Sequence, residues 1–263
     1  TFASQIGALN QAGPAKINPM PPRNKLQKFA EVARFPNVYE SFNPLKPQLV
    51  QGDSPVDLRG QWASKHFGND NPITLELACG RGEYTVELAK RYPDRNFIGV
   101  DVKGARIWRG AKKAMESELS NAAFLRTRIE PIAHFFAPGE VDEIWITFPD
   151  PFKKKGKANR RLSSAVYLRE YRKILRPGGY IHLKTDSRLL YDWTTAYFEK
   201  QDAVTVHYND DDIYAKPLPT PELDIETYYE RMHRDLGATI TYIKFSIDSE
   251  GKLDFSRELV KED

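Results

Sequence analysis

A carboxylate followed by a dense run of positive charge stands in the segment 144–162, IWITFPDPFKKKGKANRRL. Residues 144–148 are mostly β-branched or aromatic, which predicts a buried strand, and the prolines that flank Asp150 end its hydrogen-bond ladder. Ligands bind at the C-terminal edge of an open α/β sheet, so a carboxylate held there between two prolines is a candidate for chemistry. The alternative interpretation is an ordinary Pro-Asp-Pro turn with a solvated aspartate.

Six cations follow this carboxylate within nine residues, and no acidic residue stands between Asp150 and Glu170. They are Lys153, Lys154, Lys155, Lys157, Arg160 and Arg161. Such a run repels itself and needs either open water or a polyanion. Beside a strand-end carboxylate it predicts a phosphate-contacting loop next to a reaction centre, and the alternative is a solvated face.

A second candidate site lies at a strand-to-helix turn in LELACGRGEY, where four residues stand at alternate positions: Glu76, Ala78, Gly80 and Gly82. Glycines there let a ligand approach the backbone, and the following helix supplies free N–H groups. Asp101 ends the next strand, nineteen residues after Gly82, where a carboxylate can accept both hydroxyls of a ribose. A dinucleotide fits less well, because Thr85 replaces the third glycine and Glu76 would repel a pyrophosphate. A cationic sulfonium nucleoside suits both acids, so S-adenosylmethionine is the preferred cofactor and NAD the alternative.

The elements that must position these residues alternate between strand and helix patterns. Strand patterns occupy residues 73–77, 96–101, 123–126, 143–148, 180–185, 204–208 and 239–247. Helical patterns occupy residues 25–34, 84–92, 105–119, 132–136, 164–175, 189–200 and 225–236. This alternation predicts an α/β fold with a Rossmann-like, mostly parallel, seven-stranded sheet and helices on both faces.

Four segments divide the chain. Residues 1–24 are polar and proline-rich and predict a flexible or non-native N-terminal arm. Residues 25–72 predict a short helix followed by an irregular wrap, since Pro44, Pro47 and Pro55 interrupt regular structure. Residues 73–250 form the expected main domain, and residues 251–263 a C-terminal tail.

Composition limits the alternatives. The chain has 263 residues, 40% of them hydrophobic, and a net charge of +3, so a proper core is expected and basicity is confined to patches. A single cysteine, Cys79, excludes a disulfide framework, and no apolar run approaches the ~18 residues of a membrane span. We therefore expect a cytoplasmic protein without a membrane segment. The five histidines show no ligand spacing, so no metal is expected.

The segments LELACGRG, GVD, FPDPFKKKGKANRRL, LRPGGYIHLKTD and TYYER resemble the bacterial single-chain tRNA (guanine-N7-)-methyltransferases, the TrmB family, from about Ile73 to Phe245. The resemblance implies a class I S-adenosylmethionine-dependent methyltransferase domain at residues 73–250. It also implies tRNA as the partner, S-adenosyl-L-methionine as the cofactor, and a monomer or homodimer without an obligate second subunit. The implied reaction is methyl transfer to N7 of a guanine in the tRNA variable loop, of the guanine-46 type.

The resemblance also assigns roles to individual residues. Asp150 and Asp186 are the implied catalytic residues. The implied cofactor-binding residues are Glu76, Ala78, Gly80, Gly82, Asp101, Val102, Arg128, Ile129, Glu130, Thr227 and Glu230. The implied substrate-binding residues are Lys154, Arg160, Arg161, Asp186, Thr227, Tyr229, Glu230 and Arg231.

The chain departs from the family pattern at three places. Arg128-Ile129 stands where the family has an acidic residue followed by alanine, with Glu130 one step further on, so a backbone N–H of Ile129 would serve the adenine. Phe152 replaces the usual tryptophan, and Met232 or His233 stands where a glycine is expected.

Guanine N7 already carries a lone pair, so no base has to deprotonate it and positioning should dominate the reaction. Asp150 or Asp186 could accept hydrogen bonds from the N1–H and N2–H₂ edge of the guanine, and the sequence leaves open which one does. Asp186 could instead cap the helix that begins after Ser187. A-form RNA hides N7 in its narrow major groove, so the target base should lie in a loop or leave its stack.

Three other functions stay open at this point. The first is a non-catalytic RNA-binding module that shares the methyltransferase fold. The second is a methyltransferase that acts on another RNA guanine. The third is a dehydrogenase that uses NAD.

Overall fold

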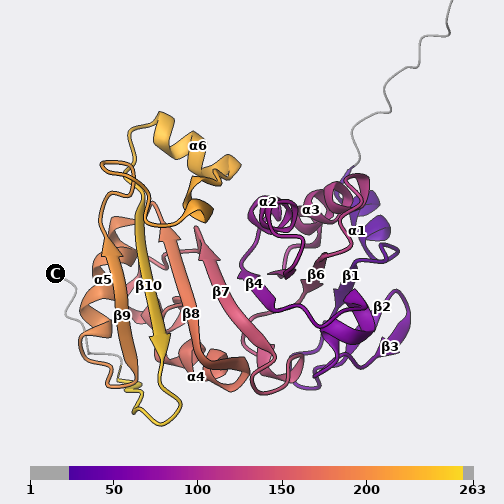
Figure 1. Cartoon of the computed structure of the whole chain (residues 1–263), viewed down its shortest axis with the longest axis horizontal. Helices are drawn as coiled ribbons and strands as arrows, with labels where there is room; N and C mark the ends of the chain where they lie inside the picture. Colours follow the sequence, from indigo (N-terminus) through magenta and orange to yellow (C-terminus); the bar gives the residue numbers. More distant parts are fainter. Residues whose placement is uncertain (1–23, 257–263) are drawn as a thin grey trace, which may run out of the picture.

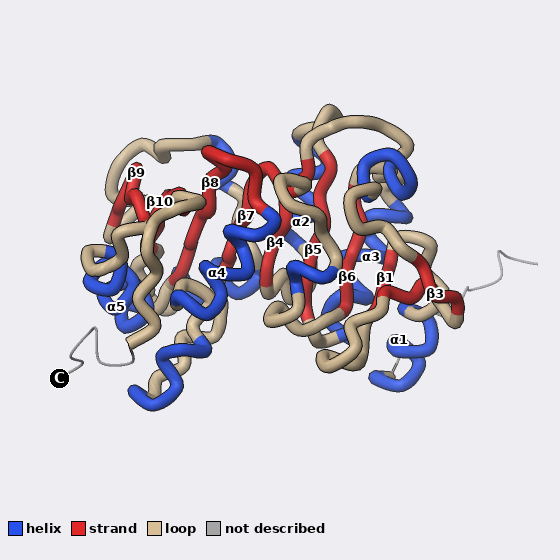
Figure 2. Tube along the Cα trace, turned by 90° about the horizontal axis from the view of Figure 1, so that it is seen from below, coloured by secondary structure: helices blue, strands red, loops and turns tan. Residues whose placement is uncertain are grey.

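Ten strands form one sheet that crosses the molecule from β9 to β3 in the computed structural model, which describes residues 24–256 (Figures 1 and 2). The strands are β1 (Val38–Glu40), β2 (Leu49–Gln51), β3 (Ser54–Val56), β4 (Ile73–Leu77), β5 (Asn96–Asp101), β6 (Ala122–Arg126), β7 (Val141–Thr147), β8 (Leu175–Thr185), β9 (Val204–Asp210) and β10 (Thr241–Ile247).

The order of the strands across the sheet is β3-β2-β1-β6-β5-β4-β7-β8-β10-β9. Neighbouring strands from β1 to β8 in this order run parallel, whereas β2, β3 and β10 are antiparallel to their neighbours. The chain builds outward from β4 through β5 to β6 and then returns to the other side of β4 with β7. This reversal is a topological switch point, beside which ligands bind at the C-terminal ends of the strands.

Helices and short helical turns connect the strands. The α-helices are α1 (Lys25–Val32), α2 (Glu83–Arg91), α3 (Gly104–Glu116), α4 (Ala165–Ile174), α5 (Arg188–Phe198) and α6 (Tyr228–Asp235). The shorter helical turns are η1 (Trp62–Phe67), η2 (Ile132–His134), η3 (Lys155–Arg160) and η4 (Pro221–Asp224).

Each face of the sheet carries its own hydrophobic core. In β6, Ala123 and Leu125 pack into the core that contains residues of α4 and α5, while Phe124 packs into the core that contains residues of α2 and α3. Burial on both faces explains why the central strands are nearly continuous apolar runs in the sequence.

The structure bears out most of the predicted elements and corrects the strand count. The patterns at 73–77 and 96–101 match β4 and β5 to the residue, and the other five predicted strands overlap β6 to β10. The pattern at 132–136, however, forms only the short turn η2. The expectation of seven strands was wrong, because β1, β2 and β3 extend the sheet beyond β6.

The three added strands come from the segment that was expected to be an irregular wrap. Pro44 and Pro47 lie in the connection between β1 and β2, where they interrupt no strand. Pro55 lies in β3, the edge strand, where a missing N–H donor is tolerated. The helix expected at 25–34 is α1. Most of the expected N-terminal arm and the end of the expected tail lie outside the described residues.

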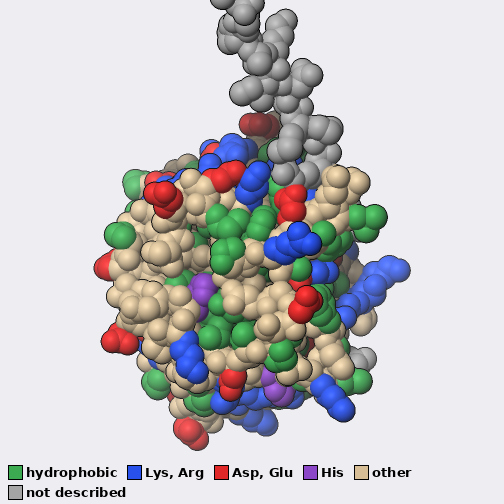
Figure 3. Space-filling model, turned by 90° about the vertical axis from the view of Figure 1, so that its right-hand side faces the viewer, with side chains coloured by type: hydrophobic (Ala, Val, Ile, Leu, Met, Phe, Trp, Pro, Cys, Tyr) green, Lys and Arg blue, Asp and Glu red, His purple; other side chains and the backbone are tan. Residues whose placement is uncertain are grey.

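The open edge at β3 faces the viewer in Figure 3, where hydrophobic, acidic and basic side chains are interspersed. Exposed Asp53 and Asp57 flank β3, and Pro55 stands inside it. Charge and proline at an edge strand hinder its pairing with a strand of another molecule. This edge is therefore protected against backbone hydrogen bonding with an edge strand of another molecule.

Three glycines surround the ring of Phe124 on β6. They are Gly82, which precedes α2, Gly99 on β5 and Gly110 on α3. A Cβ atom at Gly99 or Gly110 would lie 2.9 Å or 2.8 Å from ring carbons of Phe124, and one at Gly82 would overlap the ring. Gly82, which the sequence suggested for the approach of a ligand, is thus required by helix packing and by its φ of +66°.

Candidate active site

A cavity of about 240 Å³ lies at the C-terminal ends of β4, β5 and β6. Thr127 and Tyr167 contribute to its wall. The other lining residues are six of those that the sequence suggested for cofactor binding: Ala78, Asp101, Val102, Arg128, Ile129 and Glu130. Three segments that are distant in the sequence therefore converge at one place.

Asp101 fits the role of a ribose-binding carboxylate. It is buried at the end of β5, and its two oxygens accept hydrogen bonds from the backbone N–H groups of Gly80 (2.9 Å) and Lys103 (2.7 Å). An ionised carboxylate offers about four lone-pair sites, so lone pairs remain for two ribose hydroxyls. The backbone at Gly80 has a φ of +55°, and a Cβ atom there would meet nothing closer than 3.9 Å, which leaves room beside the loop.

Glu76 lies outside this cavity, in the interior below the glycine loop. Its carboxylate accepts hydrogen bonds from the backbone N–H of Thr85 (2.8 Å) and from the hydroxyls of Thr85 and Thr147 (2.7 Å for Thr147). It therefore ties β4 to α2 and β7. Burial raises the pKa of Glu76 to about 7, although the hydrogen bonds from the two threonines act in the opposite direction.

We expect this carboxyl group to make the protein less stable as the pH rises from about 4.5 to about 7. Its pKa is higher in the folded than in the unfolded chain, so the folded state binds more protons in this window. The free energy of unfolding therefore falls as the pH rises, until the group is ionised in both states. The effect can reach about 3 kcal/mol, at 1.36 kcal/mol for each pKa unit. Measurement of the free energy of unfolding between pH 4.5 and 8 should show a steeper decline for the wild type than for Glu76→Gln. Parallel profiles would contradict the assignment.

Asp150 is exposed in the loop that follows β7. Its Oδ1 accepts a hydrogen bond from the backbone N–H of Phe152 (2.9 Å). Phe148 and Phe152, on either side of the Pro-Asp-Pro element, have positive φ angles of 49° and 43°. Bulky residues rarely adopt this conformation, so the surrounding structure must hold the loop in place.

Arg161 supplies part of that hold, which corrects the expectation that it contacts phosphate. Its side chain is fully buried, and its guanidinium donates to the carbonyls of Pro151 (2.9 Å) and Phe152 (3.1 Å). The guanidinium also lies 4.7 Å from the ring centroid of Trp193 on α5. Arg161 is therefore a positioning residue for the loop that carries Asp150.

The other cations of the run remain on the surface. Lys154 is exposed, and Arg160 is exposed with its guanidinium 5.1 Å from the ring of Phe152. Lys153, Lys155 and Lys157 are also exposed. This part of the loop can still meet a polyanion.

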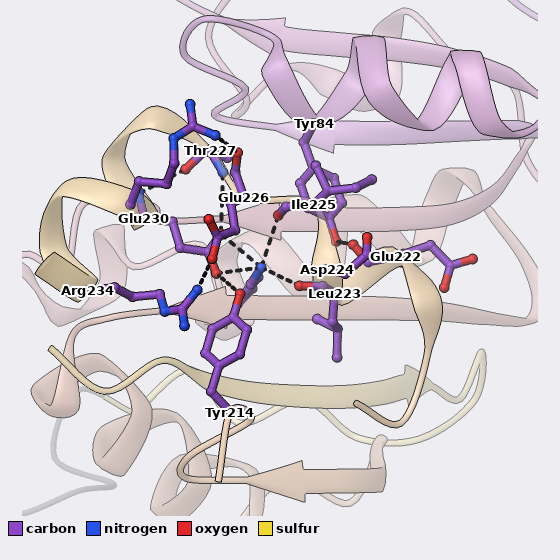
Figure 4. A network of polar contacts seen from close by, with 12 residues as sticks. Tyr84, Tyr214, Glu222, Leu223, Asp224, Ile225, Glu226, Thr227, Glu230 and Arg234 are labelled. Carbon is purple, nitrogen blue, oxygen red and sulfur yellow. Dashed lines mark hydrogen bonds and ion pairs between the residues drawn. The ribbon is translucent and has the colours of Figure 1, made fainter. Parts of the chain in front are cut away.

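A buried ion pair that the sequence did not reveal lies beneath α6 (Figure 4). Lys184 on β8 and Glu230 on α6 are both fully buried, with Nζ 2.7 Å from Oε1. Lys184 also donates to the carbonyls of Leu223 (2.9 Å) and Ile225 (3.2 Å), and Tyr214 donates its hydroxyl to Glu230 (2.7 Å). Burial lowers the pKa of Lys184, and the charge of Glu230 opposes this change.

The same contacts correct the expected roles of Thr227 and Glu230. Neither residue lines the cavity that contains Asp101. Thr227 is the N-cap of α6, its hydroxyl accepts a hydrogen bond from the backbone N–H of Glu230 (3.1 Å), and the Glu230 side chain accepts one from the backbone of Thr227. The two residues and Lys184 fix the beginning of α6 to β8. A lysine inside the predicted strand 180–185 was the available signal.

Asp186 follows β8 at the same sheet edge as Asp150. Thr147 and Lys184 are paired across β7 and β8, so the two aspartates follow neighbouring strand ends. The Asp186 carboxylate forms a side-chain hydrogen bond with Nδ1 of His233 on α6, one of the two residues that stand where a glycine was expected. The side chain of Ser187 caps α5, so the alternative in which Asp186 is the cap was wrong.

Two other suggested substrate-binding residues lie on the side of α6 that faces α2 and α3. Tyr229 is exposed, with ring contacts to His233 (6.0 Å) and the guanidinium of Arg106 (5.9 Å). Arg231 donates to the carbonyl of Glu226 (3.0 Å) and lines a second cavity, between α2, α3 and α6. Neither of these residues lines the cavity that contains Asp101.

Two absences hold for residues 24–256. None of the helices there combines the length and the apolar character that a membrane span requires. Nor does that part of the chain gather three or more His, Cys, Asp or Glu side chains in a group that could hold a metal ion.

The fold is that of the class I S-adenosylmethionine-dependent methyltransferases. A family model described as "Putative methyltransferase" matches residues 70–243. Among solved structures, the 16S rRNA methyltransferase KamB superposes with a TM-score of 0.55 at 16% identity, over 75% of this chain and 97% of that one. At 16% sequence identity, this structural similarity is evidence for the fold alone.

The sequence comparisons identify the family. A tRNA (guanine-N(7)-)-methyltransferase of Bacteroides thetaiotaomicron is 47% identical over 231 residues, which is 88% of each chain. One of Porphyromonas gingivalis is 52% identical over 200 residues, covering 76% of this chain and 81% of its own, and one of Bacillus subtilis is 34% identical over 187 residues, covering 71% and 85%. The chain belongs to the tRNA (guanine-N7-)-methyltransferase family.

Proposed function

We propose that the protein transfers the methyl group of S-adenosylmethionine to N7 of a guanine in the variable loop of tRNA. One arrangement carries this proposal. The cavity with Asp101 and the rigidly held Asp150 lie at the same sheet edge, on either side of the switch between β4 and β7. A cofactor and a planar base can therefore meet at this edge.

The proposed cofactor supplies an electrophilic methyl group. Asp101 accepts hydrogen bonds from ribose hydroxyls, and the segment 128–130, which lines the same cavity, holds the adenine end. Glu76 supports the glycine loop from below, through Thr85. These residues bind and orient, which is the main requirement when the nucleophile needs no activation.

On the substrate side, Asp150 accepts hydrogen bonds from the N1–H and N2–H₂ groups of the guanine. A carboxylate there fixes the plane of the base and adds electron density to the ring as N7 attacks. Asp186, with His233, is the second candidate for this role. Exposed Lys154 and Arg160 contact phosphates, and Tyr229 and Arg231 contact the RNA from α6.

The test is transfer of labelled methyl from the cofactor to unmodified tRNA, followed by mapping of the modified base. We expect one N7-methylguanine in the variable loop and none when that guanine is replaced by adenine. Label at another guanine would favour the alternative RNA substrate. Tight tRNA binding without transfer, and without cofactor binding by calorimetry, would favour the non-catalytic module. Binding of NAD in a fluorescence titration would favour the dehydrogenase.

We expect Asp101→Asn to weaken the binding of S-adenosylmethionine by about 10-fold or more, since hydrogen bonds to a charged group contribute about 1.5–3 kcal/mol. The amide oxygen keeps one acceptor for the backbone of Gly80 or Lys103, so the loop should stay folded. The affinity for tRNA should not change. Calorimetry with cofactor and filter binding with tRNA measure the two constants, and a loss confined to tRNA would reverse the assignment.

The proposed substrate places the reaction in the cytoplasm. Because one chain carries the residues for both cofactor and base, we further propose that a monomer or homodimer acts without a second subunit. Turnover by the purified single chain, with its mass measured by light scattering, tests this point.

A further inference from the structure

Helix α3 presents a stripe of positive side chains. Arg106, Arg109 and Lys113 stand three and four residues apart, so they share one face of the helix. At 1.5 Å per residue, this stripe is about 10 Å long. It begins beside the cofactor cavity, because exposed Lys103 precedes α3 and donates its backbone N–H to Asp101 (2.7 Å).

Two further cations extend this stripe, one from the loop before α2 and one from α6, and Figure 1 shows the arrangement of α2, α3 and α6. Arg81, from the glycine loop, and Arg231, from α6, line a cavity of about 330 Å³ together with Arg109 and Lys113. Arg81 lies 4.0 Å from the ring centroid of Tyr228, at the beginning of α6. We define the α3 face by its six cations, which are Arg81, Lys103, Arg106, Arg109, Lys113 and Arg231.

Two of the three acidic residues of this cavity pair with cations outside the α3 face. Glu87 pairs with Lys90 (2.8 Å), and Glu226 pairs with Arg234. Glu83 accepts the backbone N–H at the beginning of α6 (2.8 Å). Across residues 24–256, the structure shows no ion pair between a carboxylate and any cation of the α3 face. The face therefore keeps a positive field, which attracts a polyanion.

We propose that the α3 face binds phosphates of the tRNA backbone, so that the bound RNA extends from the catalytic edge along α3. The inference rests on the proposed function, because it takes tRNA as the substrate. Guanidinium groups match the geometry of phosphate oxygens in two-point contacts. Phosphate contacts fix the register of a nucleic acid without naming a base. The α3 face thus positions the tRNA, while the loop after β7 selects the guanine.

The test uses a double variant that carries both Arg109→Ala and Lys113→Ala. Its control is the single variant Lys112→Ala. Lys112 is the matched control because it carries the same charge on the same helix, yet its ammonium pairs with Glu116 (3.4 Å). The measurement is the slope of log Kd for full-length tRNA against log salt concentration. The double variant should reduce this slope by about 1.4 to 1.8, at roughly 0.7 to 0.9 for each lost phosphate contact. Lys112→Ala should leave the slope unchanged.

Further measurements separate the possible outcomes. The double variant should raise KM for tRNA while kcat, cofactor affinity and thermal stability stay at wild-type values. A charge-keeping variant, Arg109→Lys with Lys113→Arg, should retain the wild-type slope. An unchanged slope in the double variant, or an equal reduction in Lys112→Ala, would overturn the proposal for the α3 face. Failure of the wild type itself to methylate tRNA would instead overturn the proposed function.

Discussion

Asp150→Asn should reduce kcat by about two or more orders of magnitude while the binding constants for cofactor and tRNA stay within a few-fold of wild type. The asparagine side chain still offers an oxygen to the backbone N–H of Phe152, so the loop keeps its anchor. Arg161 holds the same loop from below and is untouched by the substitution. The substitution removes only the negative charge that, in the proposed function, faces the guanine. Single-turnover measurements with saturating cofactor and tRNA report this step directly.

Asp186→Asn is the companion variant for this experiment. It removes a charge at the neighbouring strand end and changes the contact with His233. If Asp150→Asn turns over near the wild-type rate and Asp186→Asn does not, the guanine-binding role passes to Asp186. Asp150 would then have only a structural role, in the turn that follows β7.

Lys184→Met should destabilise the protein by about 3–5 kcal/mol, the cost typical of leaving one member of a buried ion pair without its partner. Glu230 is fully buried and would keep only neutral hydrogen-bond donors, chiefly Tyr214. The carbonyls of Leu223 and Ile225 would also lose their donor. Urea denaturation of the wild type and the variant measures the difference.

Two further variants make this result specific to the ion pair. Lys184→Met combined with Glu230→Gln should recover part of the loss, because no buried charge is left unpaired. Lys244→Met, on the neighbouring β10, is the matched control, since Lys244 is only half-buried and lies 3.9 Å from the ring of Tyr180. It should change stability by no more than about 1 kcal/mol. An equal loss in Lys184→Met and Lys244→Met would contradict the role of the buried pair.

The central strands were predictable because their burial on both faces leaves a local signal in the sequence. β4 and β5 are short apolar runs that end at turn residues, and both were located to the residue. β1, β2 and β3 have three residues each, and proline interrupts their surroundings. β1 joins the sheet by pairing with β6, where Val38 lies opposite Phe124, 86 residues further along the chain, and β2 and β3 are added to the sheet through β1. No local pattern contains the pairing of β1 with β6.

The positions of candidate residues were predictable where these residues stand at strand ends. Asp101 and the segment 128–130 converge on one cavity, and Asp150 is exposed as expected. The sequence could not show that Arg161, in a run of cations, points inward to two carbonyls. Nor could it pair Lys184 with Glu230, 46 residues away, because burial of both charges arises only when α6 packs on β8.

The packing of three glycines on Phe124 constrains how this sequence can change. Alanine at Gly82 or at Gly99 displaces the same aromatic ring, so the costs of the two substitutions are not independent. The tolerance of the glycine loop to substitution therefore depends partly on Phe124, which lies on a different strand. The effect of a change at Gly82 depends on which residues already occupy positions 99, 110 and 124.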